Sequence, residues 1–129
     1  MALGDVTRQT VPKMTLLAPA QNGGVVMTRS FIPHRVHDAI GVLAAVSVAT
    51  ACVLPGTIAA DVAGPAAAGL SVLDVEHPTG FFSVDMDVDI GGTIDAPQVT
   101  VRRAALLRTA RKLMRGEIYV PQSVWEGQT

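Results

Sequence analysis

Apolar residues form one long uncharged run near the middle of the chain. No charged residue occurs between Asp38 and Asp61. Within this stretch, residues 37–54 have the composition of a helix, and after Asp38 their only polar side chains are Ser47 and Thr50. A helix with one face in water would carry a polar stripe along that face. The pattern therefore predicts a core helix that other structure wraps on every side.

Shorter apolar runs on both sides of this helix predict strands. Residues 81–89 alternate strictly, which places one face of that strand in a core and the other in water. Turn residues such as Asn22-Gly23-Gly24 and Gly91-Gly92 separate the runs. The predicted strands are residues 13–18, 25–30, 70–76, 81–89, 98–105 and 117–121.

Two further segments complete the predicted organisation. Residues 108–115 have helical propensity and carry basic side chains late in the segment, and Gly116 supplies a stop. Residues 59–69 are rich in Ala and Gly and are expected to be irregular in part. The sum is an α+β fold in a single unit over residues 1–129, with strands wrapped around one central apolar helix.

Composition narrows the class of protein. The chain has 129 residues, of which 49% are hydrophobic, and a mean hydropathy of +0.38, so a packed domain is expected rather than disorder. A net charge of −1 lacks the basic footprint of nucleic-acid binding. The single Cys52 argues against a disulfide framework or a cysteine-rich zinc site and favours a reducing, cytoplasmic location.

A membrane span is the alternative interpretation of the apolar run. Pro55-Gly56 ends the predicted helix after about 16 residues, whereas a bilayer needs roughly 20. We therefore expect no membrane association. Cys52 lies mid-helix among apolar residues and is interpreted as ordinary packing.

The candidate ligand-binding residues lie at the start of the long helix. His34, Arg35, His37 and Asp38 are expected in or near its first turn, where unpaired backbone N–H groups favour a carboxylate or phosphate. Asp38 could instead cap the helix. His77 lies in the segment EHPTG, where it could face a cleft, although Pro78 and Gly80 favour a role in the turn.

Two clusters of charged residues are interpreted as solvated surface rather than as binding sites. Asp85, Asp87 and Asp89 share a strand face at a spacing of about 6 to 7 Å, which favours a solvated surface over a metal site. The basic residues after position 101 are interpreted as a helix surface, because no aromatic residues interleave with them. The motifs of serine hydrolases, nucleotide-binding loops and zinc proteases do not occur.

Three segments together resemble the C-terminal part of the PrpF family, which includes 2-methylaconitate cis-trans isomerase, 3-methylitaconate isomerase and 4-oxalomesaconate tautomerase. They are the long helix with its PGT ending (residues 37–57), EHPTG (76–80) and RTARKLMRGEIYVP (108–121). The resemblance implies a diaminopimelate epimerase-like fold, in which two similar domains enclose the active site. It also implies cofactor-independent isomerisation of a small unsaturated di- or tricarboxylic acid by proton transfer.

The resemblance covers only the second domain of such an enzyme. The family's catalytic Lys and Cys belong to the first domain, so no catalytic residue and no metal ligand is expected in this chain. The residues implied to bind the substrate are Arg29, Ser30, His34 and His37. Many members carry Thr-Gly or Ser-Gly in the first turns of the helix, where this chain has Leu43-Ala44.

Two functional hypotheses follow. In the first, the chain is part of a PrpF-type isomerase and is inactive alone, because a complementing N-terminal chain must supply the first domain. A homo-oligomer is the other expected partner, because it would cover exposed apolar surface. In the second, it is a non-catalytic remnant that binds carboxylates or packs on a partner, because an apolar helix with half its wrapping would expose a large apolar patch.

Overall fold

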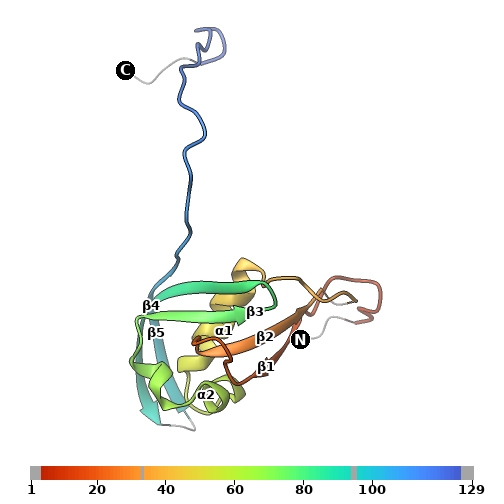
Figure 1. The fold of residues 1–129 in the computed structure, drawn as a ribbon, viewed down its shortest axis with the longest axis vertical. Helices are drawn as coiled ribbons and strands as arrows, with labels where there is room; N and C mark the ends of the chain where they lie inside the picture. The colour runs from red at the N-terminus through yellow and green to blue at the C-terminus, as the bar shows by residue number, and fades with distance from the viewer. Residues whose placement is uncertain (1–3, 33, 94–95, 126–129) are drawn as a thin grey trace.

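Five strands form one curled sheet in the order β1-β2-β3-β4-β5 (Figure 1). The computed structural model describes residues 4–32, 34–93 and 96–125. Neighbouring strands pair antiparallel, except that β2 and β3 run parallel. The strands are β1 Met14–Ala18, β2 Val26–Phe31, β3 Val72–His77, β4 Gly80–Thr93 and β5 Ala96–Leu106. These bounds confirm the first five predicted strands.

The parallel pair requires a crossover, and this crossover contains the helices. It consists of α1 (Val42–Val53), α2 (Ile58–Ala63) and the short 3-10 helix η1 (Pro65–Gly69). The PGT segment separates α1 from α2. Gly56 adopts a positive φ of 81°, and the Thr57 hydroxyl accepts a hydrogen bond from the backbone N–H of Ala60 at 3.1 Å. The region expected to be irregular in part is therefore mostly two short helices.

The core lies between α1 and the inner face of the sheet. Ala45, Ala49 and Cys52 of α1 are buried there. The sheet contributes Val26, Leu73, Val75, Phe82, Val84 and Met86. The alternation predicted within β4 is confirmed, since Phe82, Val84 and Met86 are buried, while Asp85 and Asp89 form ion pairs with Arg103 and Arg102 of β5.

The long helix differs from its prediction in two ways. It begins at Val42 rather than at residue 37, because the chain after β2 folds back and the His37 N–H bonds to the Ser30 carbonyl at 2.8 Å. Gly41 is the N-cap residue, so the interpretation of Asp38 as a cap is wrong. The helix is also not wrapped on every side within the described chain, since the Leu43 side chain is 81% exposed. Its outer face is open.

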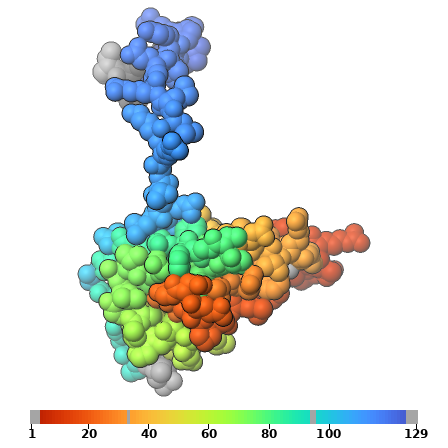
Figure 2. Space-filling model, viewed as in Figure 1, coloured from red at the N-terminus to blue at the C-terminus, as the bar shows by residue number. Residues whose placement is uncertain are grey.

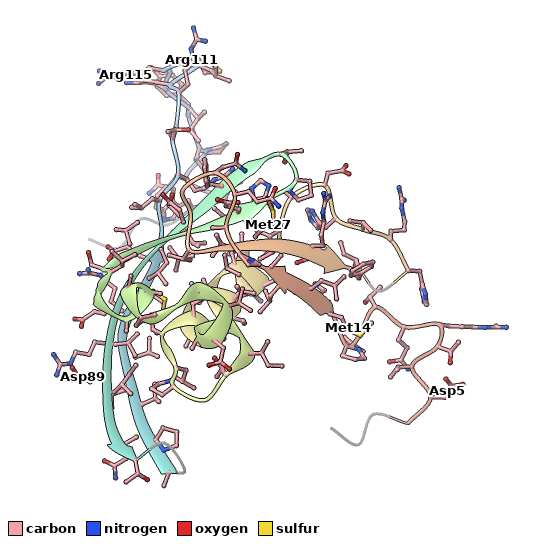
Figure 3. All side chains as sticks on the ribbon, turned by 60° about the horizontal axis from the view of Figure 1, so that its bottom comes forward. Asp5, Met14, Met27, Asp89, Arg111 and Arg115 are labelled. Carbon is pink, nitrogen blue, oxygen red and sulfur yellow. The ribbon has the colours of Figure 1, made fainter. Side chains whose placement is uncertain are left out.

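Residues 107–125, here called the C-terminal arm, leave the body after β5 and extend away from it (Figures 1 and 2). The helix predicted at 108–115 and the strand predicted at 117–121 are wrong, because residues 107–121 form no regular element. Ile118 and Tyr119 are each 89% exposed. An eight-residue helix needs a surface on which to pack. Arg108 lies over the Phe82 ring at 5.2 Å, but residues 109–121 are exposed and do not pack on the body. Arg111 and Arg115 lie far out along it (Figure 3).

No helix in the described ranges is both long enough and apolar enough to cross a bilayer.

Candidate functional site

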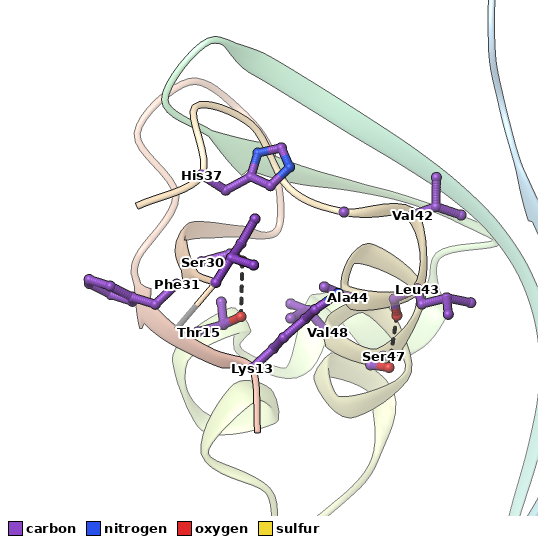
Figure 4. Close-up of a pocket in the computed structure, with 12 residues that line it drawn as sticks. Lys13, Thr15, Ser30, Phe31, His37, Val42, Leu43, Ala44, Ser47 and Val48 are labelled. Carbon is purple, nitrogen blue, oxygen red and sulfur yellow. Dashed lines mark hydrogen bonds between the residues drawn. The ribbon is translucent and has the colours of Figure 1, made fainter. Parts of the chain in front are cut away.

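A pocket of about 500 Å³ opens between the β1–β2 pair and the first turn of α1 (Figure 4). One wall is polar and comes from the two strands, and another is the N-terminal end of α1. The lining residues are Lys13, Thr15, Ser30, Phe31, Ile32, His37, Gly41, Val42, Leu43, Ala44, Ser47 and Val48.

Strand pairing builds the polar wall. Thr15 lies opposite Ser30 in the antiparallel register of β1 and β2. Their hydroxyl oxygens are 3.0 Å apart, within hydrogen-bond distance (Figure 4). Lys13, two residues before Thr15, is exposed, and its side chain extends from the β1 side toward α1. The wall therefore combines a positive charge with a pair of hydroxyl groups.

The start of α1 supplies backbone donors. The first intrahelical hydrogen bond runs from the Ala45 N–H to the Gly41 carbonyl at 2.8 Å. The N–H groups of Val42, Leu43 and Ala44 therefore have no partner within the helix, and all three residues line the pocket. The first turn of α1 carries no acidic side chain, so its dipole is not neutralised locally. A carboxylate is stabilised in such a place.

His37 reaches the pocket from the loop between β2 and α1 (Figure 4). Its Nδ1 accepts a hydrogen bond from the backbone N–H of Ala39 at 3.0 Å. A nitrogen that accepts a hydrogen bond carries no proton, so the ring proton belongs to Nε2. His37 can thus donate one hydrogen bond from Nε2.

The structure brings together only part of the predicted substrate-binding set. Ser30 and His37 line the pocket, whereas Arg29 and His34 do not. Arg29 is exposed and follows the alternation of β2, which places its side chain on the opposite face of the strand from the buried Ser30. His34 is exposed in the loop, outside any helical turn.

Sequence reasoning missed Lys13 and Thr15. They join Ser30 only through the pairing of β1 with β2 across a loop of seven residues, from 19 to 25. The anion site at the helix start stays a prediction, and the helix itself begins at Val42, several residues later than the sequence indicates. The local signal for this later start is Gly41, which directly precedes Val42 and is a residue type that N-cap positions accept.

Two other singled-out residues have structural roles. Cys52 is 2% exposed on the buried face of α1, and burial raises the pKa of its thiol to about 11. Such a thiol stays protonated near neutral pH, as ordinary packing requires. His77 takes part in the turn between β3 and β4, where its Nδ1 accepts the backbone N–H of Thr79 at 3.3 Å.

Lys13, the hydroxyl pair, the helix N–H groups without a partner in the helix and the His37 donor line one pocket, and together they supply a positive charge and hydrogen-bond donors of the kind that organic anions accept. The family model described as "PrpF protein" matches residues 3–121. The chain belongs to the PrpF family.

Relatives of this chain carry names that specify a substrate. It is 54% identical over 120 residues to a Novosphingobium protein named (4E)-oxalomesaconate Delta-isomerase, covering 93% of this chain and 32% of the relative. It is 44% identical over 127 residues to the 4-oxalomesaconate tautomerase of Pseudomonas putida, covering 98% and 33%. The chain thus spans about one third of the length of these curated relatives.

Proposed function

We propose that this chain forms one wall of the active site of a PrpF-type isomerase whose substrate is an unsaturated polycarboxylic acid of the oxalomesaconate kind. The observation that carries the proposal is the pocket at the start of α1, which is lined by Lys13 and by three helix residues whose N–H groups have no partner within the helix. The names of the two relatives support the substrate class. We further propose a cytoplasmic enzyme that needs no cofactor.

The proposed chemistry moves a proton between two carbon atoms. A base removes a proton from the carbon next to a carboxylate or keto group, and the electron pair spreads along the conjugated system onto oxygen. An acid then returns a proton to a more distant carbon, which shifts the double bond. The groups that transfer the proton would be the Lys and Cys of the family's first domain, outside this chain.

Within this scheme the chain's own residues hold the substrate and stabilise charge. The helix N–H groups and the Lys13 ammonium bind a carboxylate and the negative charge that develops beside it. Ser30 and Thr15 offer hydroxyl hydrogen bonds, and His37 donates from Nε2. Arg29 and His34, which lie outside the pocket lining, remain predicted substrate contacts for variants to test.

We propose that the fold is the second half of a diaminopimelate epimerase-like enzyme, with α1 as its central helix. The open outer face of α1 and the exposed apolar side chains of the C-terminal arm support this assignment, since both lack cover in the described chain. Further polypeptide, on the same or a separate chain, or a second copy, would cover them and close the pocket.

The test is complementation with the remaining two thirds of the Novosphingobium relative. The 129-residue chain, the complementing part and the mixture obtained by co-expression are each assayed with 4-oxalomesaconate. We expect isomerisation only by the co-expressed pair, with kcat/KM about tenfold lower for Ser30→Ala, a substitution that removes one hydroxyl from the site. Turnover by the chain alone would contradict the proposed division of the active site.

The alternative is a non-catalytic carboxylate-binding protein. It is favoured by Leu43-Ala44, which places no hydroxyl side chain in the first turn of α1. The same experiment separates the two functions. A co-expressed pair that binds cis-aconitate but leaves 4-oxalomesaconate unchanged would support the alternative.

A further inference from the structure

Thr79 joins two parts of the chain that lie 41 residues apart. Its side-chain Oγ1 donates a hydrogen bond to the backbone carbonyl of Asp38 at 3.0 Å. Thr79 belongs to the EHPTG turn between β3 and β4, whereas Asp38 belongs to the loop that connects β2 to α1. The turn motif therefore reaches the loop that forms one side of the pocket.

The neighbouring His77 directs the Thr79 proton toward that loop. The Thr79 hydroxyl lies 3.2 Å from His77 Nδ1, but the Thr79 backbone N–H already donates to the same nitrogen at 3.3 Å. A neutral imidazole nitrogen has one lone pair, so the hydroxyl proton is available to the Asp38 carbonyl. His77 thus orients the hydroxyl group without entering the pocket lining.

The residue that this contact holds is adjacent to His37. On one side, the His37 N–H is bonded to the Ser30 carbonyl at 2.8 Å, which ties the loop to β2. On the other side, the Ala39 N–H donates to His37 Nδ1. The Asp38 carbonyl lies between these two bonds along the chain, so movement of Asp38 would disturb both.

We propose that Thr79 is a positioning residue for the pocket. By holding the Asp38 carbonyl, its hydroxyl fixes the backbone on both sides of His37, and this geometry presents Nε2 to the ligand. The role in binding rests on the proposed function, whereas the effect on the loop does not depend on it.

The test compares two substitutions at this position. Thr79→Val keeps the shape of the side chain and removes the hydroxyl, and Thr79→Ser keeps the hydroxyl. Thr100→Val, on the exposed face of β5, is the matched control. Amide hydrogen exchange of His37 and Ala39, and the ¹⁵N chemical shifts of the His37 ring, are measured by NMR without ligand. Affinity for cis-aconitate is then measured by titration.

We expect Thr79→Val to raise both exchange rates and to weaken cis-aconitate binding by about tenfold, the effect of losing one ordinary hydrogen bond. The Nδ1 shift should move as its hydrogen bond to Ala39 weakens. Thr79→Ser and Thr100→Val should match the unmodified chain.

Unchanged exchange rates and ring shifts in Thr79→Val would overturn the positioning role, as would failure of Thr79→Ser to restore them. The exchange rates test the positioning role even if the unmodified chain binds no cis-aconitate. Absence of cis-aconitate binding would contradict the proposed function instead.

Discussion

Glu76 and Gly24 fit against each other at the end of β3. The Gly24 N–H donates to Glu76 Oε1 at 2.9 Å, and a Cβ atom at Gly24 would lie 2.7 Å from Glu76 Cγ. The Glu76 carboxylate is fully buried and also accepts the backbone N–H groups of Gln21 at 2.9 Å and Asn22 at 2.6 Å. The loop between β1 and β2 is therefore fixed to β3, which sets the polar wall of the pocket.

Gly24→Ala should destabilise the chain by about 1–3 kcal/mol, the usual range for overpacking. The added methyl group would lie 2.5 Å from the Asp74 carbonyl oxygen, a backbone atom that cannot move aside without shifting β3. Urea unfolding followed by circular dichroism measures the loss. Gly91→Ala is the control, because its Cβ would meet no atom within 4 Å. Equal stability of the two variants would show that the loop yields easily.

Glu76 should make the chain sensitive to acid. Burial alone raises the pKa of this carboxyl group, but the N–H groups of Gln21, Gly24 and Asn22 stabilise its charged form, and the pKa lies below the ordinary value of 4.5. A lowered pKa contributes stability that is present above the unfolded-state value and is lost as pH falls through the folded-state value.

Glu76→Gln tests this contribution. In the variant, the amide nitrogen of Gln faces a backbone N–H group that a carboxylate oxygen of Glu76 accepts in the unmodified chain. We therefore expect the free energy of unfolding to fall by about 1–3 kcal/mol at neutral pH. The difference between the two proteins should begin to shrink as the pH falls below the ordinary value of 4.5, where the unfolded chain takes up the proton, and should be lost as the pH passes the lowered pKa of Glu76 in the folded chain. Urea unfolding across this pH range measures it. A difference that is constant with pH would show that the charge of Glu76 is not what stabilises the loop.

The C-terminal arm should be cut by trypsin before strand β5. Arg111, Lys112 and Arg115 lie in extended, exposed backbone, whereas Arg102 and Arg103 lie within β5, where the sheet protects the backbone. Mass spectrometry of a time course should show cleavage after Arg111, Lys112 or Arg115 before any cleavage after Arg102 or Arg103. The product without the arm should unfold at an unchanged temperature. In the complemented pair the arm should be protected. Equal cleavage of β5 and the arm would contradict the structure described here.

The sequence predicted the body of the fold because its local and global preferences agree there. The alternation of β4 and the uncharged run of α1 specify the same core that Val84 and Ala49 occupy. Failures occurred where long-range contacts decide the outcome. Helix α1 begins at Val42, later than predicted, because the loop before it bonds back to β2 through the His37 N–H and the Ser30 carbonyl. No local pattern encodes that bond.

The C-terminal arm and the pocket both depend on long-range contacts, which the local sequence does not encode. Residues 108–121 have the local propensity for a helix and a strand, but tertiary packing supplies most of the stability of short elements, and residues 109–121 are exposed along their whole length. Lys13 and Thr15 enter the pocket through strand register alone. Ser30 and His37 line the pocket, and their role in binding stays a prediction that the family resemblance made, because such a resemblance carries information about long-range contacts that a pattern of residues does not.

The most direct test of the central claim is an NMR titration of the ¹⁵N-labelled chain with cis-aconitate. We expect saturable shift changes centred on Ser30, His37 and Val42, weakened by about tenfold or more in Lys13→Gln through loss of a charged contact. Arg111→Gln, in the exposed C-terminal arm and outside the pocket lining, is the charge-matched control and should bind as the unmodified chain does. Shift changes that are absent, or that centre outside the pocket, would contradict the account.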